Sequence, residues 1–330
     1  MNTLTNKTKY VAHYWTVQQA LEMGLKITKI HRVLEFSQSK WLEPYIAYNT
    51  AMRERATTKF DQDFRKLLIN SIFGKFLENK RKHKNVKLIA DPRKLAKLVG
   101  KPHFKPSMII NENLVAVSMG KTKITLDRPT YLGFSILDIS KTLMYDFHYN
   151  KMVKHFGRDR INICYQDTDS FLYKILTDDL YSELATFEYK HEFDFSDYPI
   201  DHIAYDGGVN KKKPGKFKDE LKSLVASRFV GLMPKMYAIE FNGEQSLRKA
   251  KGISKNFIQK HVNFKSYFEC LFENKESMAT FNSIRSFNHN LYSVMQTKRC
   301  LSARDNKRHL LADKIKTIPH GHYSLKSGDV

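Results

Sequence analysis

The segment ICYQDTDSFLYK, residues 163 to 174, has the apolar content of a strand but contains two aspartates, Asp167 and Asp169. Because side chains alternate along a strand, both carboxylates are predicted to lie on one face, near mid-strand or at a hairpin tip. The neighbouring apolar residues fall on both faces, which predicts an interior strand. Two like charges buried side by side are costly unless a cation joins them, so this segment requires a fold that supplies one.

A hard divalent cation with oxygen ligands, such as Mg²⁺, is the usual solution for paired carboxylates. The alternative is an acidic hairpin turn, because Asp-Thr-Asp also suits exposed turns. The hydrophobic residues on both flanks favour the metal site, since an exposed turn does not need them. We therefore predict that Asp167 and Asp169 are metal ligands.

A second informative segment is TTKFDQDFRKLLINSIFGKF, residues 57 to 76, which has the periodicity of an amphipathic helix. Its predicted outward stripe consists of Lys59, Asp63, Lys66, Asn70 and Phe73, and its predicted packed face of Phe60, Phe64, Leu67, Leu68 and Ser71. Phe73 followed by Gly74 offers a flat ring and a gap for close approach, as a base pair needs. Lys66 could neutralise a triphosphate, whereas the plain alternative is a solvated polar stripe.

The rest of the chain predicts a mixture of helices and strands. Residues 40 to 79 are predicted to form a helical hairpin. The further predictions are a strand, a short helix ending at Gly24 and a strand with Ile27, Ile30 and Val33; strands in 85–90, 113–126 and 230–241; a helix over about 135–155; and a helical, basic module from about Arg248 onward.

The charge balance indicates a partner that is a polyanion. Lys and Arg number 56 against 34 acids, which gives a formal charge of +22 and a pI near 9.7. Nucleic acid is the first candidate for such a chain. The basic residues recur from Lys26 to Lys326, so several faces of the folded protein are predicted to contribute.

Three cysteines, Cys164, Cys270 and Cys300, have no metal-type spacing and are predicted to be core thiols in a reducing compartment. His320 and His322 lack Cys or acidic partners at ligand spacing, so they are predicted to be loop residues. Neither a signal peptide nor an apolar run of membrane-spanning length is present, so we expect a soluble intracellular protein.

Taken together, the two segments resemble motifs of the family B DNA polymerases, especially the protein-primed branch. Lys66-x-x-x-Asn70-Ser71-x-Phe73-Gly74 is similar to the fingers motif Lys-x-x-x-Asn-Ser-x-Tyr-Gly. Tyr165-Gln166-Asp167-Thr168-Asp169-Ser170 is similar to the palm motif Tyr-x-Asp-Thr-Asp-Ser, and Lys235-Met236-Tyr237 resembles the downstream Lys-x-Tyr motif. Their order along the chain is that of the family.

The resemblance implies an α+β fold with part of a right-hand architecture. The palm, with an antiparallel sheet, would comprise residues 1–36 and 81–245. The fingers, a helical hairpin, would comprise residues 37–80, and a small thumb-like module residues 246–330. The location would be the nucleus or the cytoplasm of an infected host cell.

The resemblance also implies a role for each motif residue. Asp169 would be the principal ligand of two Mg²⁺ ions, which Mn²⁺ could replace, with Asp167 in support. Lys66 would hold the phosphates of the incoming nucleotide, and Asn70, Phe73 and Gly74 would line the new base pair. The residues expected to contact the primer and the DNA are Tyr165, Thr168, Lys235, Tyr237, Lys249, Lys251 and Gly252.

The implied reaction is nucleotidyl transfer from a deoxynucleoside triphosphate to a primer 3′ end on a DNA template, with a terminal protein as one form of primer. The family's upstream Asp-x-x-Ser-Leu-Tyr-Pro motif, which supplies a further carboxylate, has no counterpart here. We therefore expect the C-terminal part of a longer polymerase, or a part that works with a separately encoded N-terminal portion. The alternatives are a DNA-binding protein without chemistry and a nuclease or integrase, which also use paired acids with Mg²⁺.

Overall fold

The computed structural model is a mixed α+β protein, as the sequence predicts. It describes residues 6–241, 245–287, 290–304, 308–312, 316–319, 322 and 325. One compact unit comprises Ala12–Ser140 and Phe287–Asn290, and the other comprises Met1–Val11, Lys141–Ser286 and Leu291–Val330. Each unit is considered separately below, and the division into palm, fingers and thumb stays a prediction.

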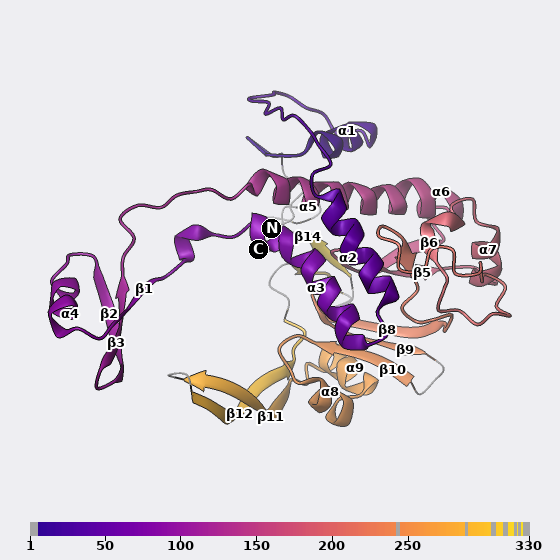
Figure 1. Ribbon diagram of the computed structural model, residues 1–330. Helices are drawn as coiled ribbons and strands as arrows, with labels where there is room; N and C mark the ends of the chain where they lie inside the picture. The colour runs from indigo at the N-terminus through magenta and orange to yellow at the C-terminus, as the bar shows by residue number, and fades with distance from the viewer. Residues whose placement is uncertain are drawn as a thin grey trace. The chain divides into compact units, whose positions relative to one another are not determined.

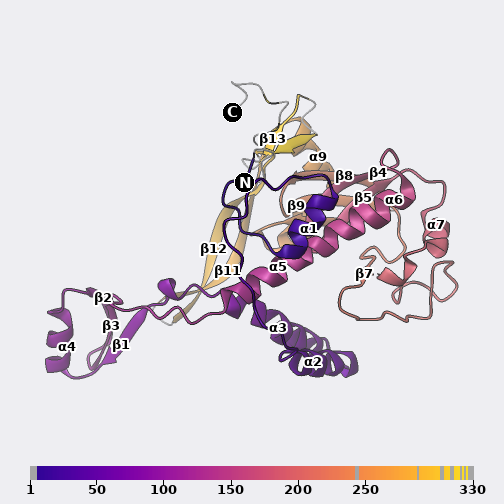
Figure 2. The same cartoon turned by 90° about the horizontal axis from the view of Figure 1, so that it is seen from above.

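Two long helices form the predicted hairpin in the first unit. Helix α2 (Glu43–Arg55) and helix α3 (Lys59–Phe76) lie side by side (Figures 1 and 2). The Thr58 hydroxyl accepts a hydrogen bond from the backbone N–H of Asp61 at 3.1 Å, which caps the start of α3. Across the hairpin, the Arg65 guanidinium donates to the side-chain oxygen of buried Asn49 at 3.3 Å.

The packed face of α3 differs from the prediction. Phe60, Phe64 and Leu67 were assigned to that face, yet they are 76%, 43% and 62% exposed. Within the hairpin, α3 packs along α2 through another side, on which Arg65 lies. A two-helix hairpin covers only one side of each helix, so periodicity identified an amphipathic helix without identifying which side is covered.

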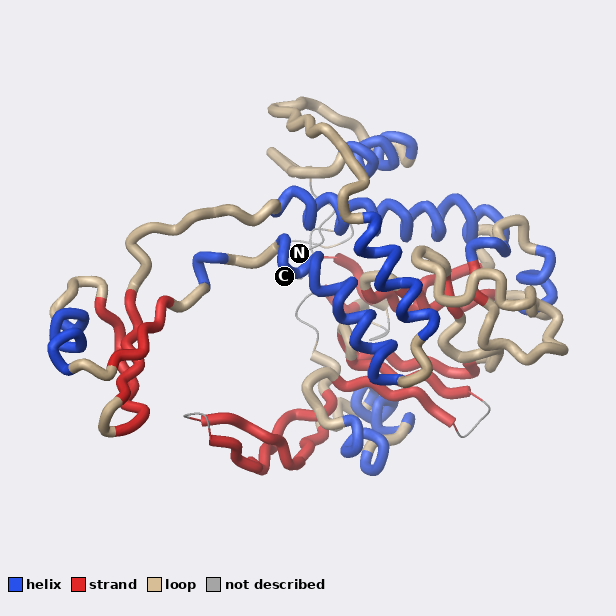
Figure 3. The backbone as a smooth tube through the Cα atoms, in the orientation of Figure 1, coloured by secondary structure: helices blue, strands red, loops and turns tan. Residues whose placement is uncertain are grey.

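A small sheet with one helix follows the hairpin (Figure 3). Strand β3 (Leu114–Met119) lies between β1 (Asn85–Ile89) and β2 (Phe104–Asn111), and all pairings are antiparallel. Helix α4 (Pro92–Val99) begins at the Asp91 cap and contributes Leu98 to a core with Val117 and Met119. The predicted strands at 85–90 and 113–126 are confirmed only to Ile89 and Met119, and the sequence reading missed α4 and β2.

The expected opening strands are wrong. Helix α1 (Tyr14–Glu22) ends near Gly24, whose φ of 90° suits a glycine, as predicted. Residues 25–36, however, form no strand, and Ile30 and Val33 are 69% and 76% exposed. A segment with apolar residues forms a strand only where a neighbouring strand supplies ladder hydrogen bonds, and none does so for residues 25–36 in the described part of the chain.

A continuous helical run is confirmed where the sequence predicts a helix over about 135–155. It consists of α5 (Thr130–Tyr145), a π-helical segment (Asp146–Met152) and α6 (Val153–Phe156). Its later part buries Phe147 and Phe156 in a core beside the hairpin of strands β4 (Ile161–Asp167) and β5 (Ser170–Ile175). The remaining elements of this region are the 3₁₀ turns Lys80–Lys82 and Lys190–Glu192, α7 (Leu180–Thr186), and the parallel pair β6 (Phe193–Asp194) and β7 (Phe217–Lys218).

The unit that includes Lys141–Ser286 has a second core, formed by a sheet and two helices. Strand β9 (Met236–Phe241) pairs with β8 (Ala226–Met233) and β10 (Gln245–Ala250), and helices α8 (Lys255–His261) and α9 (Phe264–Phe272) pack on it. Tyr267, Cys270 and Cys300 are fully buried there. The core-thiol prediction is therefore confirmed for Cys270 and Cys300 but wrong for Cys164, which is exposed on β4.

The C-terminal region is less helical than predicted. After α9 the chain forms the long antiparallel pair β11 (Ser277–Phe287) and β12 (Asn290–Leu301), and then β13 (Arg308–Leu310) with β14 (Thr317–Pro319). The basic residues spread through these strands give the region the composition of a basic helix, and composition alone does not distinguish the two. None of the helices in the described ranges has the length and apolar character of a bilayer-crossing segment.

Candidate functional site

The paired aspartates lie at the tip of a β-hairpin, which is one of the two placements predicted. Strand β4 (Ile161–Asp167) pairs antiparallel with β5 (Ser170–Ile175), and Asp167 stands opposite Ser170. Thr168 has a φ of 56°, and the Asp169 N–H donates to the Asp167 carbonyl at 2.7 Å. The Ser170 hydroxyl donates to the same carbonyl at 3.1 Å. Thr168 and Asp169 thus form a turn, so strand alternation does not orient the two carboxylates.

The prediction of an interior strand is wrong. In the described residues β4 has a ladder partner on one side only, and Ile163 is 39% exposed. The Asp167 side chain is 31% exposed, and Asp169 is exposed. Solvent therefore reaches both carboxylates, and their mutual repulsion is smaller than it would be in a core.

Lys235 meets this hairpin from a distant part of the sequence. It lies in the β8–β9 turn with a φ of 64°, a conformation that a lysine rarely adopts. Its N–H donates to the Tyr165 hydroxyl at 2.8 Å, and its ammonium forms an ion pair with Asp167. The hydrogen bond from the ammonium to Asp167 raises the pKa of Lys235 above its ordinary value. The hairpin tip is thus tied to the Lys-x-Tyr segment.

An aromatic cluster supports this contact. The ring centroids of Tyr165 and Tyr237 are 4.7 Å apart, and Phe229 lies 6.5 Å from Tyr165 and 6.1 Å from Tyr237. Burial, followed by the charges of Tyr165 and Glu220, raises the pKa of Tyr237. Its hydroxyl therefore remains a neutral hydrogen-bond donor at physiological pH.

The start of the predicted thumb-like module adjoins the same turn. The Lys251 N–H donates to the Lys235 carbonyl at 3.2 Å, and Lys249 stands opposite Tyr237 in the β9–β10 ladder. Gly252 has a φ of 86°, which lets the chain turn after β10. The Lys249 carbonyl accepts a hydrogen bond from buried Tyr267 at 2.9 Å, so α9 anchors this basic segment.

The predicted nucleotide-binding residues share one face of α3. Lys66, Asn70 and Gly74 are exposed, and Phe73 is half-buried. A Cβ atom added to Gly74 would meet no atom within 4 Å, so the space beside this glycine is open. Helix α3 belongs to the other compact unit, and its predicted approach to Asp167 and Asp169 stays a prediction.

The donor set at the hairpin tip suits a magnesium ion that shares its coordination with a substrate. Mg²⁺ commonly takes one or two carboxylates and fills its remaining positions with waters and substrate phosphates. Asp167 and Asp169 could supply those carboxylates, and the Thr168 hydroxyl donates to Asp167 Oδ1 at 3.2 Å. Within the described ranges, no three His, Cys, Asp or Glu residues form a metal-binding group.

No family model, curated protein or solved structure matches this chain. Any functional assignment consequently depends on the residues and their arrangement. Reading the sequence missed the Lys235–Asp167 ion pair and the contribution of Phe229, because no local pattern signals contacts between segments so far apart. Of the two loop histidines, His322 lies outside helices and strands, as predicted, and His320 lies outside the described residues.

Proposed function

We propose that this chain is the palm and fingers portion, with a thumb-like module, of a template-directed DNA polymerase of family B. One observation supports this most: Tyr165, Asp167, Lys235 and Tyr237, which belong to two separate family-like motifs, meet at one place. Motifs that matched by chance would have no reason to contact each other. The open space at Gly74 on α3 adds support from the fingers motif.

In this proposal each group of residues has a distinct task. Asp169 and Asp167 hold divalent ions, which would stabilise the charge that develops on the transferred phosphoryl group. Lys235 and Tyr237 position the primer end, while Lys249 and Lys251 contact the backbone phosphates. Lys66 binds the triphosphate, and Phe73 stacks on the new base pair.

Template-dependent nucleotide binding tests the proposal without requiring the isolated chain to complete synthesis. With Mg²⁺ and a primer–template, the deoxynucleoside triphosphate that matches the templating base should bind more tightly than the three mismatched ones. Lys66→Ala and Asp169→Asn should abolish this preference. Asp178→Asn, a change at an exposed aspartate away from the hairpin tip, should retain it. Equal binding of all four nucleotides would contradict a polymerase assignment.

A second candidate is a polymerase-derived protein that binds DNA without chemistry. The Lys235 ammonium favours it, because it already neutralises Asp167, one of only two carboxylates at the described hairpin tip. This candidate predicts salt-dependent DNA binding that Asp169→Asn leaves unchanged, with no template-dependent nucleotide preference. Primer extension with Mg²⁺ then separates an active chain from one that needs a further carboxylate from elsewhere.

A further inference from the structure

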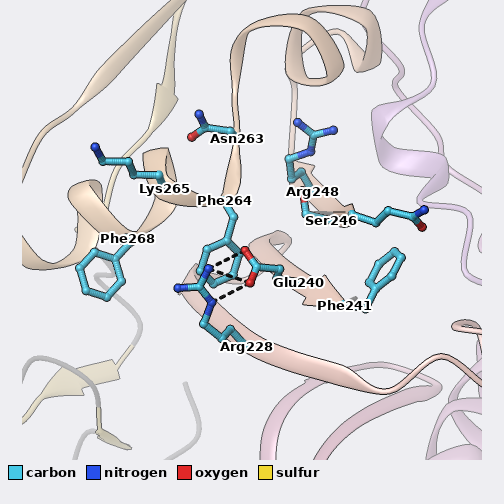
Figure 4. Close-up of a pocket in the computed structure, with 10 residues that line it drawn as sticks. Arg228, Glu240, Phe241, Ser246, Arg248, Asn263, Phe264, Lys265 and Phe268 are labelled. Atoms are coloured by element: carbon cyan, nitrogen blue, oxygen red, sulfur yellow. Dashed lines mark hydrogen bonds and ion pairs between the residues drawn. The ribbon is translucent and has the colours of Figure 1, made fainter. Parts of the chain in front are cut away.

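A groove of about 740 Å³ lies between the β8–β10 sheet and the start of α9 (Figure 4). Glu240 lines it, and in strand β9 this residue has the opposite parity to Tyr237. Because alternate side chains point to opposite faces of a sheet, the groove lies on the face away from the Tyr165–Tyr237 contact. It is therefore separate from the site described above.

Cations dominate the charged lining of this groove. Arg228, Arg248 and Lys265 contribute to it, against Glu240 as the one carboxylate among the lining residues. Glu240 is committed to Arg228, because the guanidinium donates to its two oxygens at 2.7 and 2.8 Å. The remaining cations leave the lining with an excess of positive charge.

Arg248 and Lys265 are available to an anion. The Arg248 guanidinium donates to the Val262 carbonyl and has no acidic partner among the described residues. Lys265 is held only loosely, since its ammonium lies 3.6 Å from Glu269 and its side chain is 79% exposed. Neither cation would have to break a strong ion pair to bind a phosphate.

Aromatic rings complete the lining. In Figure 4, Phe268 and Phe241 lie at opposite ends of the groove, with the Arg228–Glu240 pair and Phe264 between them. The Arg228 guanidinium lies over the buried Phe264 ring, 4.9 Å from its centroid. Phe268 is 46% exposed, so its ring can stack on an incoming planar group.

We propose that this groove binds a short stretch of single-stranded nucleic acid. Arg248 and Lys265 would contact backbone phosphates, and Phe268 would stack on a base, which is how proteins bind single strands without reading their sequence. An acidic peptide would satisfy the cations but leave the exposed ring of Phe268 without a planar partner. Since the groove is on the opposite face of the sheet, the proposal does not depend on the polymerase assignment.

Matched variants test the groove with a fluorescent oligothymidine as the probe. Lys265→Glu should weaken binding about tenfold and make it less sensitive to salt, because one phosphate contact is lost. Lys260→Glu makes the same charge change at an exposed lysine of α8 outside the groove and should have a smaller effect. Phe268→Ala should weaken binding about tenfold or more by removing a stacked base.

Crosslinking locates the bound strand directly. An oligonucleotide containing bromouracil should crosslink after irradiation to the peptide of α9 that includes Phe268. Circular dichroism confirms that each variant is folded, and Lys265→Glu, a change on the exposed surface, keeps the test valid if Phe268→Ala unfolds. Equal effects of the Lys265 and Lys260 changes, crosslinks confined to other segments, or stronger competition by polyglutamate than by oligothymidine would overturn the proposal.

Discussion

The ammonium of Lys235 is bonded to the carboxylate of Asp167, a residue 68 positions earlier in the chain. The backbone N–H of Lys235 donates to the Tyr165 hydroxyl, so Lys235 contacts β4 through both its main chain and its side chain. A cation that already sits on Asp167 must move when a divalent ion binds there. Lys235 is therefore predicted to compete with the metal.

Replacing Lys235 by methionine should increase the affinity of the hairpin tip for Mn²⁺ by about twofold to fivefold, a size typical of exposed ion pairs. The substitution removes a competing and repelling charge and keeps a side chain of similar length. Titration followed by the electron paramagnetic resonance of free Mn²⁺ measures the change. Lys213→Met, at an exposed lysine shortly before β7, serves as the control, and unchanged affinity in Lys235→Met would refute the competition.

Gly74→Ala should separate stability from nucleotide binding. Alanine is favoured over glycine in a helix interior by about 1 kcal/mol, and the added Cβ meets no atom within 4 Å, so the thermal midpoint should rise. If the open space accommodates a base pair, the affinity for the matched nucleotide should fall in the same variant. Thermal unfolding and nucleotide titration measure the two effects, and a stabilised variant with unaltered nucleotide affinity would exclude the assigned role of Gly74.

His148 should contribute to a loss of stability in mild acid. Burial lowers its pKa below the ordinary value of 6.5, so the unfolded chain binds a proton that the folded chain resists. Stability therefore falls as the pH drops from about 6.5 through the lower folded pKa, and the effect is complete below it. The titratable side chain of Tyr173 faces this ring, with its hydroxyl 3.2 Å from Nδ1.

His148→Phe keeps a ring that can stack on Tyr173 and removes the titrating group. Thermal midpoints measured between about pH 7 and pH 5 should depend less on pH in this variant than in the parent protein. The difference between the two proteins isolates His148 from the other histidines. Identical pH profiles would show that protonation of this residue does not limit stability.

Local patterns in the sequence predicted the elements whose signals are local. The α2–α3 hairpin has helical periodicity and a capping threonine at Thr58. For the β4–β5 segment the sequence predicts a strand and leaves open whether the aspartates lie in mid-strand or at a hairpin tip, where the structure places them. The sequence-based prediction was wrong for segments whose structure depends on pairing with another segment of the chain. Ile30 and Val33 lie in a segment predicted to be a strand but have no ladder partner in the described residues, whereas β11 and β12 pair with each other in a region predicted to be helical.

The candidate site, too, could be predicted from the sequence only in part. The family resemblance implies that Asp167 is a metal ligand and that Tyr165, Lys235 and Tyr237 contact the primer or the DNA, and the structure brings these four residues together. The ion pair itself could not be predicted, because the sequence does not show which of many lysines reaches Asp167. The exposure of β4 was also missed, since apolar residues on both faces do not guarantee that both faces are covered.

Tyr165→Phe tests whether the conformation of Lys235 depends on the tyrosine hydroxyl. The substitution keeps the ring that packs 4.7 Å from Tyr237 and removes the oxygen that accepts the Lys235 N–H. A backbone with positive φ at a lysine is strained and needs such surrounding contacts. Loss of the acceptor should loosen the turn and weaken primer–template binding about threefold to tenfold, an effect expected for one hydrogen bond.

A double-mutant cycle with Lys235→Met distinguishes this coupling from a direct contact between the hydroxyl and DNA. If Tyr165 acts through Lys235, the double variant should bind DNA no more weakly than Lys235→Met alone. If the hydroxyl contacts DNA itself, the two losses should add. Fluorescence anisotropy with a primer–template at fixed salt measures all four proteins, and full additivity would show that the hydrogen bond to Lys235 does not position that residue for DNA.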